Sequence, residues 1–148
     1  MIEVEESVDV ARDRATVYRQ WLDVESMPRF MEAVKSVHRL DDMHTHWVAE
    51  VSGRRREWDA ETTQQVADKV ISWKSVGGIG SSGTVWFEEL DAGTRVTVRV
   101  QYEPEGFEEQ VGELLGVFQA QVRQDLERFR RLLEGDARDA GDTLRKAG

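Results

Sequence analysis

Five polar side chains have the types and positions from which a buried catalytic site could be built. Glu6, Thr62, Tyr102 and Gln119 share the phase of apolar neighbours, and Arg29 follows a short helical turn. A carboxylate can remove a proton next to a carbonyl, and a hydroxyl or guanidinium can hold the resulting oxyanion. Glu6, Tyr102 and Arg29 are therefore the catalytic candidates. Their spacing does not form a recognisable catalytic set, so ligand binding is the favoured interpretation and catalysis the alternative.

Other motifs in the sequence are better explained without a cofactor. The glycine-rich stretch 77–83 lacks the Lys-Ser/Thr pair that ends a phosphate-binding loop, and it lies between two expected strands. His38, His44 and His46 have no neighbouring carboxylate that completes a metal-binding set, and the chain contains no cysteine. We therefore expect neither a metal nor a cofactor.

Arginine and tryptophan residues leave two pairs of alternatives open. Arg54, Arg55 and Arg56 follow a tight turn in an otherwise acidic sequence. They can keep a sheet edge soluble, or they can guide an anionic ligand. Trp58 and Trp73 can be ordinary core material or the wall of a ligand site.

Length and charge limit the function further. The chain has 148 residues, which fits one domain, and its 29 acidic and 20 basic residues give a net charge of -9. This charge repels phosphate backbones, so we do not expect nucleic acid as a partner. No window approaches the roughly 18 apolar residues of a membrane span, and no leader pattern begins the sequence. We therefore expect a cytoplasmic protein.

The order of elements follows from hydrophobic periodicity. Residues 2–10 alternate as a strand with one buried face, and two short helices follow, capped by Asp13 and Ser26. Six strands come next, at about 34–41, 44–51, 55–66, 69–76, 84–90 and 94–103. A long amphipathic helix then runs from Phe107 to Leu133. One antiparallel sheet with an apolar face needs a cover, and only this helix is long enough.

Two glycines in the long helix suggest a hollow beneath it. Gly112 and Gly116 are one turn apart and interrupt the apolar stripe on the packing side of the helix, and each costs about 1 kcal/mol relative to alanine. Missing side chains leave room for a ligand, although close contact between helix and strand is the alternative. The predicted ligand-binding residues line the inner faces of sheet and helix: Phe30, Trp47, Trp58, Ala60, Thr62, Ile71, Trp73, Val85, Phe87, Val98, Val100, Gly112, Leu115, Gly116 and Gln119.

The connections between strands predict where this hollow opens. Hairpin turns alternate between the two ends of an antiparallel sheet, so 52–53, 77–83 and the turn into the long helix fall at one end. We expect the two short helices at this same end. The predicted gate over the opening consists of Gly78, Ile79 and Gly80.

Three segments carry a resemblance to a known family: PRFM at 28–31, REWDAE at 56–61 and YEPEG at 102–106. With the order of elements, they resemble the polyketide cyclase/dehydrase and coenzyme-Q-binding branch of the START-like, helix-grip (SRPBCC) superfamily. The resemblance implies an α+β fold, in which a curved seven-stranded antiparallel sheet wraps around the C-terminal helix and two short helices join strands 1 and 2.

The same resemblance implies a function and two alternatives to it. It implies binding of a hydrophobic small molecule, such as a lipid, a quinone or a polyketide-like compound. The alternatives are a cyclase/dehydrase enzyme and a protein-interaction module like the chaperone activators or ribosome-associated factors. The resemblance covers residues 1–134 as a single domain, and the polar segment 135–148 is expected to be disordered.

Overall fold

A computed structural model describes residues 2–51, 53–77, 80–102 and 111–147, with side chains omitted at 51, 111–114 and 136–147. The elements, in chain order, are β1 (Ile2–Val10), α1 (Arg14–Leu22), the 3-10 helix η1 (Val24–Arg29), β2 (Val34–Arg39), β3 (His44–Val51), β4 (Arg54–Val66), β5 (Val70–Val76), β6 (Ser81–Leu90), β7 (Gly93–Tyr102) and α2 (Val111–Ala147). This order confirms the expected succession of strand, two short helices, six strands and long helix.

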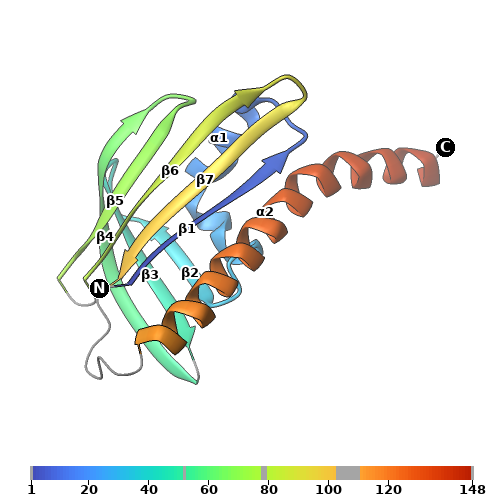
Figure 1. Cartoon of the computed structure of the whole chain (residues 1–148). Helices are drawn as coiled ribbons and strands as arrows, with labels where there is room; N and C mark the ends of the chain where they lie inside the picture. The colour runs from blue at the N-terminus through green and yellow to red at the C-terminus, as the bar shows by residue number, and fades with distance from the viewer. Residues whose placement is uncertain (1, 52, 78–79, 103–110, 148) are drawn as a thin grey trace.

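The seven strands form one antiparallel sheet in the order β1-β7-β6-β5-β4-β3-β2. The sheet is strongly curved, and α2 runs along its β1 side (Figure 1). The α+β architecture predicted from the sequence is therefore confirmed. The largest difference at a strand boundary is in β6, which begins at Ser81 because Ser81 and Ser82 still pair with Tyr102 and Gln101 of β7.

The position of α1 corrects one prediction. All neighbouring strands are antiparallel and six pairings separate β1 from β2, so these two strands run in the same direction. β1 ends beside Gly93 and Thr94, whereas Ser81 and Tyr102 lie at the opposite end of the sheet. Consequently α1 covers the end opposite the 77–80 connection, and the chain crosses the concave side before it enters β2. Hereafter the α1 end is called the closed end, and the other the loop end.

The start of the second short helix is also corrected. Asp13 caps α1 as predicted, since its side chain accepts a hydrogen bond from Thr16 N at 3.1 Å. Ser26, however, lies inside η1 and does not cap it. Its hydroxyl donates to the carbonyl oxygen of Asp23 at 2.6 Å, which places the first residue of the turn earlier, at Val24.

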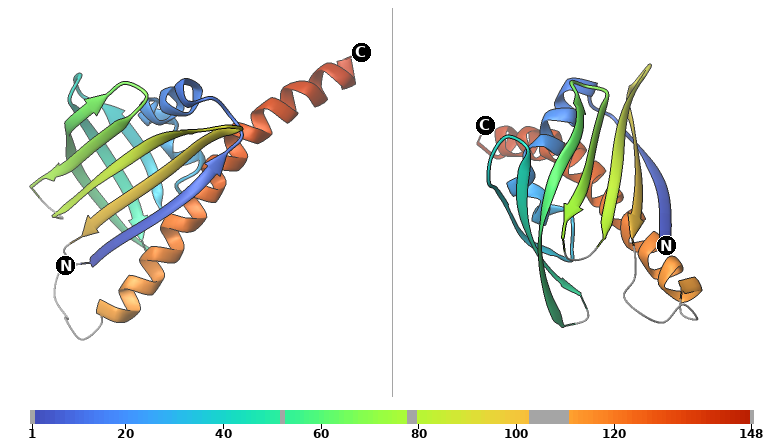
Figure 2. Two further views of the ribbon diagram at one scale, coloured as in Figure 1. Left: turned by 45° about the horizontal axis from the view of Figure 1, so that its top comes forward. Right: turned by 90° about the vertical axis from the view of Figure 1, so that its left-hand side faces the viewer.

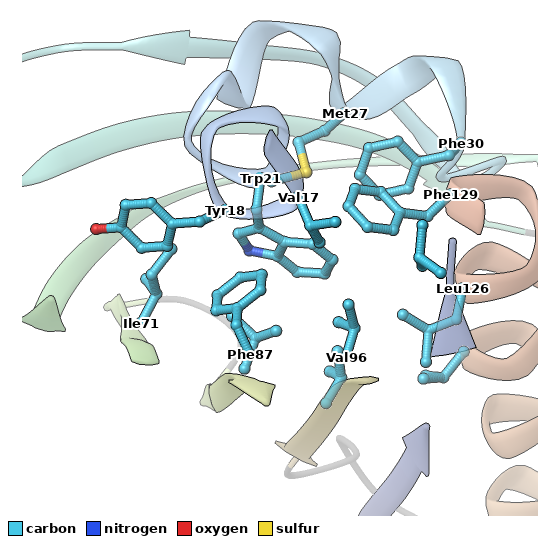
Figure 3. Close-up of a cluster of buried hydrophobic side chains, with 14 of the residues drawn as sticks. Val17, Tyr18, Trp21, Met27, Phe30, Ile71, Phe87, Val96, Leu126 and Phe129 are labelled. Carbon is cyan, nitrogen blue, oxygen red and sulfur yellow. The ribbon is translucent and has the colours of Figure 1, made fainter. Parts of the chain in front are cut away.

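An aromatic cluster fills the closed end, with contributions from α1, from Phe30 just after η1, and from β6 and α2 (Figure 3). Phe30 and Phe129 meet edge to face at 4.9 Å between ring centroids, and Trp21 lies 5.3 Å from Phe129. Tyr18 contacts the ring of Phe87 at 5.4 Å. Rings in these geometries stabilise the fold beyond their area of burial, by about 0.5–1.5 kcal/mol per pair.

The end of α2 differs from the expectation of a disordered tail. The helix continues through Ala147 and projects beyond the sheet (Figure 2). Among the described side chains of α2, the last in the hydrophobic core is Leu133, at 3% exposure. The segment after Gly135 contains no proline, and its three alanines, two arginines, one leucine and one lysine favour helix, so a helix already formed can extend through it, one hydrogen bond per residue.

Candidate functional site

The inner face of the sheet is the one predicted from alternation. Ala60, Ile71, Val85, Phe87 and Val98 are all buried there, at 6% exposure or less. The register supports this assignment, because each of these residues pairs with another residue of the inner set or lies two positions from one. Trp86 points outward as expected, and its ring lies 5.3 Å beneath the guanidinium carbon of Arg99.

Burial of this face differs between its two ends. At the closed end Phe30, Phe129 and Val96 are 0–1% exposed. Toward the loop end Ile2, Val4 and Ala49 are still buried, but seven other apolar residues of sheet and helix are only half-buried. We call this half-buried set the aromatic wall: Trp47, Trp58, Trp73, Val100, Tyr102, Leu115 and Phe118. The predicted ligand-binding residues therefore fall into two groups. Some belong to the aromatic wall. Others, namely Phe30, Ile71, Val85 and Phe87, belong to the fully buried part of the inner face, here called the closed core.

Trp73 was predicted to line the ligand site, but its contact with Gly83 was not identified from the sequence. The two residues are paired across β5 and β6 on the inner face. A Cβ atom added at Gly83 would lie 2.3 Å from Cζ2 of Trp73, so the indole lies directly over the glycine backbone. The signal was available in the sequence, since glycine in a strand often marks such a close approach. Gly83 was instead assigned to the loop.

Trp47 and Trp58 continue the wall on β3 and β4. Their rings are stacked, with centroids 6.0 Å apart and an interplanar angle of 11°. The indole N–H of Trp47 donates to Thr45 Oγ1 at 2.8 Å, which fixes the ring against its own strand. Together the two indoles present an apolar surface, and the N–H donor of Trp47 is already satisfied.

Helix α2 supplies the side of the wall that faces β7. Phe118 lies 6.0 Å from the ring of Tyr102, and Leu115 is half-buried one turn earlier. Gly116 is exposed, and a Cβ atom added there would meet no atom within 4 Å. Open space at Gly116 contradicts the close-packing alternative at this position. Gly112 is helical, but its surroundings lie outside the described side chains.

The three catalytic candidates do not come together. The carboxylate of Glu6 accepts hydrogen bonds from Gln119 Nε2 at 3.0 Å and from Arg123 Nη2 at 2.9 Å, both to Oε1. Tyr102 belongs to the aromatic wall, whereas Arg29 is exposed at the end of η1. Glu6 thus links β1 to α2 through an ion pair, and this geometry supports a structural role for its carboxylate.

The remaining predicted residues are distributed as follows. Thr62 is half-buried on the inner face of β4, paired with Trp73, and Gln119 is engaged with Glu6. Of the predicted gate, Gly78 and Ile79 lie outside the described residues, and Gly80 is exposed just before β6. The two strands that flank this connection, β5 and β6, meet it at the same end of the sheet as the β3–β4 turn, as predicted, although β6 begins three residues earlier than expected.

The histidines lie on the outer face, away from the wall. His46 Nδ1 is 2.7 Å from Asp59 Oδ1, and Nε2 is 3.1 Å from Glu57 Oε1. Hydrogen bonding to Asp59, with a further contribution from Glu57, raises the pKa of His46 above its ordinary value. In the described part of the chain, no three His, Asp or Glu side chains form a group that could hold a metal ion.

A hollow lies over β1, β6 and β7, away from the aromatic wall. This broad, open depression has a volume of about 560 Å³ and is lined by Glu5, Arg14, Lys69, Trp86, Phe87, Glu88, Glu89, Thr97 and Arg99. Arg99 is engaged there by Glu3 at 3.4 Å and Glu5 at 2.9 Å. Because cations and carboxylates alternate along its lining, the depression offers a mixed surface without a dominant chemical character.

One element buries charge in a way that holds α2 in place. Asp125 accepts hydrogen bonds from Gln121 at 2.8 Å and Arg128 at 2.5 Å, and Arg128 also donates to the carbonyl oxygen of Phe30 at 3.0 Å. Burial raises the pKa of Asp125 despite the neighbouring guanidinium.

Among the described helices, none has an apolar stretch long enough to cross a membrane.

A curved antiparallel sheet closed by a C-terminal helix is the START-like, helix-grip fold, which the chain shares with a START superfamily protein of Mycobacterium smegmatis, with a TM-score of 0.74, 15% identity and coverage of 88% and 98%. The model of the family "Polyketide cyclase / dehydrase and lipid transport" matches residues 10–130, and the chain belongs to this family.

Individual relatives agree with this assignment. An uncharacterized 17.2 kDa protein of Streptomyces lincolnensis is 38% identical over 143 residues, which cover 95% of each chain. A crystal structure from Deinococcus radiodurans is similar with a TM-score of 0.74 and 31% identity, covering 90% of this chain and 98% of the other. An aromatase/cyclase from Streptomyces sp. R1128 shares the fold, with a TM-score of 0.70, 18% identity and coverage of 92% and 93%.

Proposed function

We propose that this protein binds a hydrophobic small molecule against the aromatic wall, between the loop end of the sheet and the first described turns of α2. The carrying observation is the difference in burial along one apolar face. Phe129 at the closed end is fully buried, whereas Trp73 and Phe118 are only partly buried on the same inner side of the molecule. Apolar surface left accessible in a concave site is a common feature of ligand sites.

Membership of a family described as acting in polyketide cyclisation, dehydration and lipid transport supports a ligand of this kind. The polar groups near the wall support binding more than chemistry. Glu6 is neutralised by Arg123, and Trp47 satisfies its donor on Thr45. A site of this composition gains affinity from apolar contact and uses few polar groups to orient the ligand.

Catalysis is the second candidate, because a fold neighbour is an aromatase/cyclase and Tyr102 carries a hydroxyl on the wall. If a proton is transferred, Glu6→Gln and Tyr102→Phe should each reduce the rate by about 10²-fold or more, the usual contribution of general acid–base catalysis. Turnover of a poly-β-ketone mimic that both substitutions abolish would establish this activity.

The binding proposal is tested with N-phenyl-1-naphthylamine, a neutral apolar probe whose fluorescence rises on burial. We expect Val100→Phe, on the wall, to weaken probe binding by at least about tenfold, or about 1.4 kcal/mol. Gln101→Phe is the matched control, because it places the same ring on the outer face of the same strand. Native mass spectrometry of the freshly purified protein should also detect a bound apolar molecule. Equal probe affinity in Val100→Phe and the parent would contradict the proposed site.

A further inference from the structure

The β3–β4 hairpin separates its charged residues between the two faces of the sheet. Its carboxylates occupy the outer face: Glu50, Glu57, Asp59 and Glu61. Their contacts confirm this placement, because Glu57 and Asp59 bind His46, and Glu61 lies 3.8 Å from Lys74 of β5. The middle arginine, Arg55, is on the same outer face, 3.5 Å from Glu57.

Arg54 and Arg56 occupy the opposite, inner face. Arg56 pairs with Ala49, which is 4% exposed, and it shares its phase with Trp58 two positions on. At about 3.3 Å per residue, Arg56 begins about 7 Å from Trp58 along the strand, and Arg54 about 13 Å. Arg56 is half-buried and Arg54 is exposed. Two guanidinium groups therefore follow the stacked indoles toward the tip of the hairpin.

This tip lies at the loop end, on the same side of the molecule as the beginning of α2 (Figures 1 and 2). The rim of the proposed ligand site is thus basic on β4 although the whole chain carries a net charge of -9. If these arginines served only to keep the hairpin soluble, the face of the sheet on which each one lies would not matter. Arg54 and Arg56 instead continue the face of β4 that carries Trp58, and this position beside the aromatic wall favours a recognition role.

We infer that the ligand is a hydrophobic acid, whose apolar body lies against the aromatic wall and whose carboxylate is held at the rim by Arg54 and Arg56. This inference rests on the proposed function. Arginine suits the role because its planar fork of N–H donors matches a carboxylate and remains charged at all relevant pH values. The neighbouring indoles lower the local exposure to water, which strengthens the attraction of the guanidinium groups for an anion.

The test compares dodecanoic acid with 1-dodecanol, which has the same chain length and a neutral head group. Both displace N-phenyl-1-naphthylamine, and the ratio of their affinities measures recognition of the head group alone. We expect the parent protein to favour the acid by at least about tenfold at pH 7.5, and this preference to fall with added salt. Arg54→Gln and Arg56→Gln should each lower the preference several-fold and leave the affinity for 1-dodecanol unchanged.

Arg55→Gln is the matched control, because it removes the same charge from the same strand but on the outer face. It should leave the preference for the acid unchanged, and circular dichroism should show all three variants folded. Equal affinity of the parent for acid and alcohol would overturn the inference. So would an Arg55→Gln variant that loses as much preference as Arg54→Gln, since general charge attraction would then explain the result. Failure of the probe, the acid and the alcohol to bind at all would instead refute the proposed function.

Discussion

Replacement of Gly83 by alanine tests the geometry of the aromatic wall directly. The new Cβ atom would lie 2.3 Å from Cζ2, 2.7 Å from Cη2 and 2.9 Å from Cε2 of Trp73. Ordinary contact between these carbons requires at least about 3.4 Å, so the indole or β6 must move by about 1 Å. Overpacking of this kind costs about 1–3 kcal/mol, and we expect Gly83→Ala to lower the free energy of unfolding by that amount.

A double-mutant cycle separates this clash from the effect of alanine on the strand itself. Trp73→Leu removes the ring that the new methyl group meets, so in this background Gly83→Ala should cost nothing or stabilise slightly. The free energies come from urea denaturation followed by circular dichroism, since Trp73 itself contributes to the fluorescence. An equal loss of unfolding free energy from Gly83→Ala in both backgrounds would show that the indole does not lie over Gly83. The position given to Trp73 in the aromatic wall would then be wrong.

Three further substitutions test separate parts of the structure. Gly116→Ala should raise the free energy of unfolding by up to about 1 kcal/mol in urea denaturation, because the added methyl group meets no atom and helix propensity improves; destabilisation would reveal hidden close packing. Glu6→Gln should destabilise the fold less in an Arg123→Gln background than in the parent, whereas equal losses in both would show that the pair is not coupled. The pKa of His46, measured by NMR titration, should exceed 6.5 and fall in Asp59→Asn; since the folded-state value is raised, the stabilisation is present below pH 6.5 and disappears as the pH rises through the folded-state pKa. An unchanged titration in the Asp59 variant would contradict the hydrogen bond.

Alternation of side chains explains why the sheet was predictable from the sequence. A shift of one residue in the pairing of a strand would turn all of its inward apolar side chains to the other face. The face on which Val96 and Val98 lie is therefore strongly determined. The same reasoning placed Trp58 and Trp73 correctly on the inner face. It does not determine how completely a residue is covered, because coverage depends on where α2 crosses the sheet. The division between closed core and half-buried wall therefore required the structure.

The position of α1 was mispredicted for a topological reason. Local patterns give the direction of the chain from strand to strand, but they do not tell which strand β1 joins. In the structure β1 pairs with β7, so the chain must cross the concavity to reach β2. Long-range ion pairs were hidden for a similar reason, since Glu6 and Arg123 are 117 residues apart in the sequence. Neither position carries a local signal of its partner.

Polar contacts, here called tethers, hold α2 to other segments of the chain. Their distribution along the helix explains why the aromatic wall lies at one end only. Near the closed end Glu134 accepts a hydrogen bond from the backbone N–H of Ala11, and the carbonyl oxygen of Leu133 accepts one from Arg12. Asp125 and Arg128 then fix the helix to the segment that follows η1.

Toward the loop end the contacts change in kind. Glu6 supplies the last polar tether through Gln119 and Arg123 among the described residues, and one ring contact follows between Tyr102 and Phe118. Polar tethers fix direction, whereas an apolar contact between half-exposed rings can be replaced by a ligand of similar character. A ligand at the wall would therefore exchange apolar contacts and leave the tethers of the closed end intact, so binding and folding stability are carried by different parts of one helix.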